Sequence, residues 1–288
     1  MTAAVWRRLG PAVLVCLAAP AFFVLGWSWA GWVLIATGVG TAALVERGAP
    51  RTVSVSAGHR PTWEIGRKRM PSLTRDLALI ALGMVIVHAI SLEAQLDDLA
   101  MLRFTLALGG AVAVPYLVSR FVLRERAISF PWRAHRPWNR WQWGWLVAVL
   151  VLGWLILPFY FITSGVYLNW PVVDSPELIG RLFVGVGAVG IWDELFFICT
   201  VFALLRRHLP DAAANVLQAL VFVSFLWELG YRAWGPVLTI PFALLQGWIF
   251  LRTHSLAYVV TVHLLFDAVV FAVLVHAHNP GLLPFFLV

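Results

Sequence analysis

Long apolar segments recur along almost the whole chain and are separated by short polar links. Hydrophobic residues make up 61% of the sequence and charged residues only 12%, whereas a soluble domain is about 45–50% apolar and about 25% charged. A helix needs about 20 apolar residues to cross a bilayer, and the 288 residues hold about eight or nine such segments. The sequence therefore predicts an all-α fold, a polytopic transmembrane helix bundle.

The first apolar run, residues 11–45, is too long for one span, because a single helix of that length would measure roughly 50 Å. A cluster of Trp and Gly at residues 26–32 interrupts it, and Trp rings prefer the membrane interface. We expect two spans that meet at this cluster. The other expected spans are residues 77–92, 103–122, 142–163, 178–204, 213–230, 236–252 and 256–277.

The basic residues are concentrated in a few of the polar links. The chain has 21 Lys and Arg against 14 acids, a net charge of +7. Most of them are Arg7 and Arg8 or lie in the links 46–75, 120–140, 206–211 and 252–255. Cytoplasmic loops of membrane proteins carry such an excess. We therefore predict a multi-pass integral membrane protein with its N-terminus in the cytoplasm.

The composition also indicates the surroundings of the protein. It is rich in Arg and Trp and poor in Lys, which is typical of a bacterial protein and favours the bacterial plasma membrane. Trp residues alternate with Arg in the link 120–140, a pattern that beside a span favours an anchor at the lipid interface. We expect contact with the lipid bilayer and no nucleic-acid partner.

Two adjacent carboxylates, Asp193 and Glu194, lie inside an apolar run with no basic residue within three positions. An ionised carboxylate at the centre of a membrane helix costs about 2.5–3.5 kcal/mol on the milder scales. Such a group needs a partner, a proton or a water-filled cavity. The pair therefore indicates a functional site. The structural alternative is that one acid caps a kink or pairs with a distant Arg.

Three further polar residues, Glu228, His263 and Asp267, lie inside later apolar segments. The spacing of His263 and Asp267 places them on one helical face. From the expected cytoplasmic ends, Glu194, Glu228, Asp267 and His263 lie about 18, 22, 16 and 10 Å deep. Similar depths indicate a shared cavity. Alone, each has a structural interpretation as a hydrogen-bonded or solvated group.

Like charges held close together require that a carboxyl keeps a proton or that a cation binds. A carboxylate with a shared proton can act as a general base on water. Carboxylates and a histidine can also bind a divalent metal that generates hydroxide. Both alternatives stay open.

Residues of about 178–278 resemble the CPBP family of intramembrane proteases, which includes the CAAX prenyl endopeptidases and the bacterial Abi-type proteins. Three motifs carry the resemblance. Residues 193–198 occupy the place of a Glu-Glu pair followed by Arg, and residues 224–229 that of a Phe-x-x-x-His segment. Gly247, the turn 253–256 and His263 to Asp267 follow a Gly-containing helix, a Thr-Gly-Ser-Leu turn and a His-x-x-x-Asn helix.

The chain departs from the family motifs at several positions. The departures are Asp193 for the first Glu, Ile198 for the Arg, Ser224 for the Phe, Glu228 for the first His and Asp267 for the Asn. Glu and Asp at the last two positions are similar to PrsW-type membrane proteases. The loss of the Arg removes a group that could orient the acidic pair.

The resemblance implies an intramembrane endopeptidase that hydrolyses peptide bonds of a membrane-associated protein or peptide. It implies that Asp193 or Glu194 is the general base, that Glu228 helps to hold the water and that His263 stabilises the oxyanion. Asp267 could share that role only when protonated. A divalent metal such as zinc among Glu194, Glu228, His263 and Asp267 is the alternative, or no cofactor at all.

The resemblance divides the chain into residues 1–141, an N-terminal transmembrane region with basic cytoplasmic loops, and residues 142–288, a catalytic transmembrane core. Two other function classes remain open. One is a non-catalytic family member with an immunity or binding role. The other is a transporter with a proton relay, although we find no inverted repeat.

Overall fold

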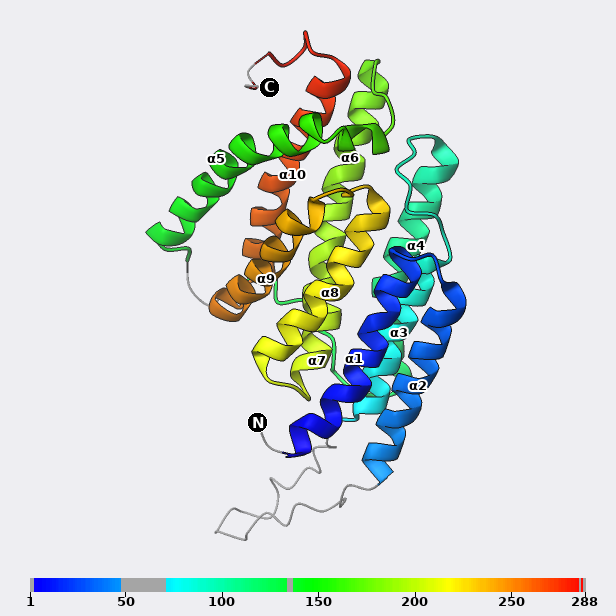
Figure 1. Ribbon diagram of the computed structural model, residues 1–288. Coiled ribbons are helices and arrows are strands. Elements are labelled where there is room, and N and C mark those ends of the chain that lie inside the picture. The colour runs from blue at the N-terminus through cyan, green and yellow to red at the C-terminus, as the bar shows by residue number, and fades with distance from the viewer. Residues whose placement is uncertain (1–2, 48–70, 134–136, 285, 287–288) are drawn as a thin grey trace.

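The computed structural model describes residues 3–47, 71–133, 137–284 and 286, and within these ranges the regular elements are all helical (Figure 1). Eight of the described helical segments are long and apolar enough to cross a membrane. The prediction of an all-α bundle with about eight or nine spans is confirmed, and the protein is an integral membrane protein. Most of the basic link 46–75 and Arg136 of the second basic link lie outside the described residues.

The expected division of the first apolar run is confirmed. Helix α1 (Ala3–Phe23) and helix α2 (Ser28–Arg47) form a hairpin whose turn contains Gly26 at φ +67°, a left-handed conformation that glycine adopts without steric cost. Trp27 and Trp29 beside the turn are 54% and 70% exposed, as expected for rings at a membrane interface.

Helix α3 (Leu73–His88) and helix α4 (Asp98–Leu117) follow, and α4 continues into the π-helix η2 (Val118–Val122). The side chain of Asp97 accepts hydrogen bonds from two backbone N–H groups at the start of α4, at 3.1 and 3.0 Å. With 16 residues, α3 is only about 24 Å long, shorter than a hydrocarbon core of about 30 Å, and it is not among the eight membrane-length helices.

The remaining helices form the core of the bundle. They are α5 (Arg140–Thr163), the short 3-10 helix η3 (Val166–Asn169), α6 (Pro176–Asp193), the π-helix η4 (Glu194–Phe202), α7 (Ala203–Arg206), α8 (Asp211–Leu229), α9 (Gly235–Thr253) and α10 (Leu256–His278). Each predicted span of this region has a corresponding helix.

The continuous segment α6–η4–α7 is the central element of the molecule. Its apolar window is 72% buried, more than that of any other membrane-length helix described. It packs against α10 and α4 through α6, and against α8, α9 and α10 through η4 (Figure 1). A polar residue on this segment is therefore surrounded by protein.

Candidate active site

The helix changes its hydrogen-bonding pattern at the acidic pair. Asp193 is the last residue of α6, and Glu194 is the first residue of the π-helix η4. The hydroxyl of Thr200 donates to the carbonyl oxygen of Leu195 at 3.0 Å within this wider turn. Both Asp193 and Glu194 are only 2% exposed. Local π-helical geometry within α-helices is frequent at functional sites.

Helix α10 brings His263 and Asp267 against this junction. Two of the first backbone N–H groups of α10, those of Leu256 and Ala257, donate to the carbonyl oxygens of Pro131 and Trp132 at 2.8 and 3.2 Å, which fixes the start of the helix. Farther along, His263 is 3% exposed.

Gly190 permits the close approach of α10 to α6. A Cβ atom at Gly190 would lie 1.9 Å from Oδ2 of Asp267, a distance that no real contact allows. Asp267, which is 7% exposed, thus packs into space that only glycine leaves open.

The imidazole of His263 lies among three carboxyl groups. Its Nδ1 is 2.7 Å from Oε1 of Glu194, and its Nε2 is 3.5 Å from Oδ2 of Asp193 and 3.8 Å from Oδ1 of Asp267. A carboxylate oxygen only accepts, so Nδ1 donates to Glu194, and Nε2 is the nitrogen on the side of the two Asp residues. Four of the five predicted site residues are therefore brought together.

Two cavities adjoin this cluster. The larger has a volume of about 380 Å³, and its polar lining includes Asp193, His263 and Asp267 among mostly apolar side chains such as Phe242. Phe104 from α4 also lines it, so the N-terminal region contributes to its wall. The smaller has a volume of about 10 Å³ and is lined in part by Asp193, Glu194, Gln218 and Gln246.

The two members of the acidic pair thus have different surroundings. Asp193 lines both cavities, whereas Glu194 lines the small cavity and not the large one. Glu194 lies beside His263 and holds its Nδ1. Of the pair, Asp193 is the acid that a molecule in the large cavity could reach.

Glu228 does not join the other four residues. The face of α8 that lines the large cavity carries Phe222, Leu226 and Leu229. Glu228 lies on another face, is partly buried, and interacts with the backbone of Leu92 and the charge of Arg232. The depth estimated from the sequence is similar for Glu228 and the other predicted site residues, but Glu228 lies on a face of α8 that does not line the large cavity. The catalytic role predicted for Glu228 stays a prediction.

Gln246 of α9 was missed by the sequence reasoning. It is 3% exposed, and its Nε2 donates to Oε1 of Glu194 at 2.6 Å. The available signal was an amide inside an apolar span, directly before Gly247, which the motif comparison had already aligned.

The arrangement of the side chains bears on the predicted metal site, whose ligands would be Glu194, Glu228, His263 and Asp267. Among the residues that the structure describes, no group of three or more His, Cys, Asp or Glu side chains is arranged to hold a metal ion. Glu228 lies apart, and Nδ1 of His263 is engaged by Glu194. This donor set does not fit a metal in the observed arrangement.

Residues 175–269 match the family model described as type II CAAX prenyl endopeptidase Rce1-like. This segment, about a third of the chain, is similar to that family. The match confirms the family resemblance that the motifs indicated, and it includes the acidic pair, Glu228, His263 and Asp267. Comparisons with curated proteins and with solved structures gave no match.

The turn before α10 agrees with this family match. His254 stands where the resemblance places the Gly of the Thr-Gly-Ser-Leu turn, and its φ is +49°, in the left-handed region that favours glycine. The motif alignment and the backbone therefore have the same register at this point.

Proposed function

We propose that the protein is an intramembrane endopeptidase that hydrolyses peptide bonds of a membrane-associated protein or peptide. The single observation that carries the proposal is the group of Asp193, His263 and Asp267 at the wall of an otherwise mostly apolar cavity of about 380 Å³. Three carboxyls lie around one imidazole there. Because like charges repel, at least one carboxyl keeps a proton, and a site that holds both protonated and ionised groups is suited to proton transfer. The Rce1-like match over residues 175–269 supports the same reaction class.

The proposed reaction is general-base hydrolysis. Asp193 removes a proton from water, and the water oxygen forms a bond to the carbonyl carbon of the scissile peptide. The C–N bond then breaks, and the proton passes from Asp193 to the leaving amine, so that a carboxylic acid and an amine are released. All atoms come from the peptide and one water.

His263 and Asp267 are assigned to the developing oxyanion. With Nδ1 held by Glu194, the imidazolium form of His263 donates from Nε2, and a protonated Asp267 donates from its carboxyl. Glu194 acts through His263, which it orients. Unlike Asp193, it does not line the large cavity.

The substrate and location follow as further parts of this proposal. A mostly apolar cavity between membrane-length helices suits an extended segment of a membrane-associated protein. The distribution of Arg supports a cytoplasmic N-terminus and a bacterial plasma membrane. Residues 142–288 are proposed as the catalytic core and residues 1–141 as a region that completes the cavity wall.

The test compares two matched substitutions, Glu194→Gln and Glu228→Gln, in the purified protein reconstituted in lipid nanodiscs. A library of apolar peptides is incubated with each protein, and the products are identified by mass spectrometry. We expect cleavage by the wild type, loss of cleavage in Glu194→Gln and retained cleavage in Glu228→Gln. Full activity of a folded Glu194→Gln protein would overturn the assignment of Glu194. Cleavage by none of the three would favour the non-catalytic alternative.

A further inference from the structure

Glu194 is held at one oxygen by two donors from two different helices. Oε1 accepts from Nδ1 of His263 on α10 at 2.7 Å and from Nε2 of Gln246 on α9 at 2.6 Å. We propose that Gln246 is a positioning residue, which fixes the Glu194 carboxylate and through it the orientation of His263. The proposal rests on the proposed function for its kinetic consequences but not for its geometry.

The chemistry of its neighbours determines which end of the Gln246 amide points to Glu194. Besides Glu194, the same Nε2 donates to the carbonyl oxygen of Val259 at 3.1 Å. Both neighbours are acceptors, so only the NH₂ end can face them. The carbonyl oxygen is buried without a hydrogen-bond partner among the described residues, and Gln246 lines the small cavity with Asp193 and Glu194.

Gln246 contacts Glu194 and the helical turn of α10 that leads to His263. Val259 lies four residues before His263 in α10, so its carbonyl oxygen belongs to the helical turn that carries the imidazole. The Gln246 amide therefore binds the Glu194 carboxylate directly and also links α9 to the turn of α10 that precedes His263. Loss of the amide would free both groups to move relative to one another.

The backbone around Gln246 is itself fixed by two amide side chains of α8. Asn215 donates to the carbonyl oxygen of Leu244 at 2.8 Å, and Gln218 donates to that of Ala243 at 2.9 Å. Gly247 makes this possible, because a Cβ atom there would lie 1.9 Å from Oδ1 of Asn215. The turn that presents Gln246 is thereby docked on the neighbouring helix.

Three variants test the proposal. Gln246→Leu removes the donor at similar size, and Gln246→Glu keeps the shape but replaces the NH₂ by a carboxyl oxygen. Asn279→Leu is the matched control, since the Asn279 amide also ties a helix to another segment, donating to the carbonyl oxygen of Val173 at 2.6 Å, and lines neither cavity. We expect Gln246→Leu to lower kcat about 10- to 100-fold with little change in KM, because a misplaced catalytic group slows the reaction without altering the cavity. Asn279→Leu should leave kcat within about twofold.

The pH dependence of Gln246→Glu distinguishes a positioning role from a merely structural one. A protonated Glu at this position can donate to Glu194, whereas an ionised one repels it. The activity of Gln246→Glu relative to wild type should therefore rise as the pH falls. A constant ratio across the pH range would contradict the proposal. This variant also carries the test if Gln246→Leu fails to fold.

A second measurement is independent of catalysis. ¹⁵N NMR of labelled histidines, with the His263 signals assigned by their loss in His263→Gln, reports the protonation of each ring nitrogen. We expect these signals to move in Gln246→Leu and to stay in Asn279→Leu. If the signals move but the wild-type protein cleaves no peptide, the positioning role of Gln246 is supported and the proposed function is refuted. Unmoved signals with unchanged kcat would overturn the role of Gln246 alone.

Discussion

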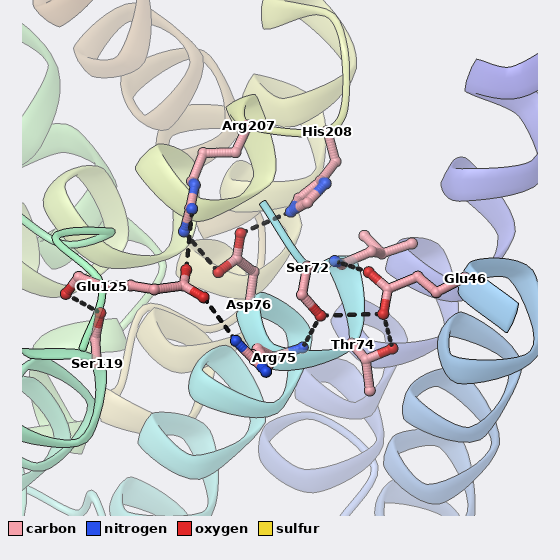
Figure 2. Close-up of polar contacts among 10 residues, drawn as sticks. Glu46, Ser72, Thr74, Arg75, Asp76, Ser119, Glu125, Arg207 and His208 are labelled. Carbon is pink, nitrogen blue, oxygen red and sulfur yellow. Dashed lines mark hydrogen bonds and ion pairs between the residues drawn. The ribbon is translucent and has the colours of Figure 1, made fainter. Parts of the chain in front are cut away.

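Two polar clusters of this protein, each containing at least one buried acid, differ in how their charges are balanced. The paired cluster consists of Arg75, Asp76, Glu125, Arg207 and His208, and the open cluster consists of Asp193, Glu194, His263 and Asp267. In the paired cluster, Asp76 accepts from Arg207 at 2.8 Å and lies 2.6 Å from His208, so both of its oxygens have a basic partner (Figure 2). In the open cluster, three acids share one imidazole.

The paired cluster joins segments that are far apart in the sequence. Arg207 also contacts Glu125 at 3.2 Å, and Glu125 contacts Arg75 at 2.9 Å (Figure 2). Beside it, Glu46 accepts from the backbone N–H of Leu73 and from two hydroxyls at the start of α3 (Figure 2). The cluster therefore fastens α3 and the segment after η2 to the end of the central helix, and Glu46 fastens α2 to the start of α3.

Among the described residues, the buried carboxyl oxygens that lack a hydrogen-bond partner all lie in the open cluster. Oδ1 of Asp193, Oε2 of Glu194 and Oδ2 of Asp267 are buried and have no hydrogen-bond partner among the described residues, whereas no side-chain atom of the paired cluster is in this state. Burying an unpaired polar group lowers stability. A buried acid that is paired with cations, such as Asp76, stabilises the fold. Buried acids that outnumber their basic partners, as in the open cluster, are candidates for a catalytic role.

The largest expected effect is on the open cluster. Asp193→Asn removes the acid that lines both cavities, so kcat should fall by on the order of 100- to 10,000-fold, the contribution typical of a general base. Thermal unfolding should not worsen, because Oδ1 of this buried carboxyl has no hydrogen-bond partner in the wild type. Cleavage rate and unfolding temperature are measured in the same detergent. A strongly destabilised Asp193→Asn protein would place Asp193 with the structural acids.

The opposite result is expected for the paired cluster. Asp76→Ala leaves Arg207 and His208 without their shared partner, which should lower the free energy of unfolding by about 3–5 kcal/mol. Unfolding in denaturant measures the loss, and kcat of the folded fraction should stay unchanged. Asp98→Ala is the control, because Asp98 pairs with Arg181 at 2.6 Å but its side chain is 89% exposed. That change should cost about 0–1 kcal/mol.

A smaller effect is expected from the contact that completes the open cluster. Gly190→Ala inserts a Cβ atom 1.9 Å from Oδ2 of Asp267, so Asp267 or α10 must move and kcat should fall about 10- to 100-fold. Gly187→Ala is the matched control on the same helix, since a Cβ atom there meets nothing within 4 Å. Equal kcat values for the two variants would show that the position of Asp267 does not matter for cleavage.

The smallest effect is expected at the edge of the paired cluster. The side chain of Arg75 is 43% exposed, and its partner Glu125 keeps Arg207 when Arg75 is replaced. Arg75→Ala should therefore lower the free energy of unfolding by about 0.2–1 kcal/mol, and less at high salt. Unfolding at two ionic strengths measures this. A loss as large as that of Asp76→Ala would mean that the whole cluster acts as one unit.

The sequence predicted the spans well because hydrophobicity acts over each segment as a whole. The turn between α1 and α2 was found from the Trp and Gly residues that break the apolar run. The interactions of Arg207 and His208 were not found, since these residues were assigned only to a short basic link. Their partner Asp76 lies 131 and 132 residues earlier in the chain.

The candidate site was predicted in part. Buried polar residues at matched depth indicated Asp193, Glu194, His263 and Asp267, and the structure brings these together. The same reasoning included Glu228, which has the right depth but lies on another face of α8. A helix that is apolar on all sides has no periodic pattern that identifies its inner face. Gln246 was missed because a single neutral amide gives no charge signal.

The sequence by itself determined that the chain is a membrane-embedded helical bundle and which residue types lie deep within it. These properties follow from the free energy of transferring each side chain into lipid, which depends on composition and length. Only the tertiary structure decided that Asp193 reaches the cavity, that Gln246 holds Glu194 and that Asp76 has its partners. Those outcomes depend on the rotation and approach of packed helices, which small residues such as Gly190 permit and which no single segment encodes.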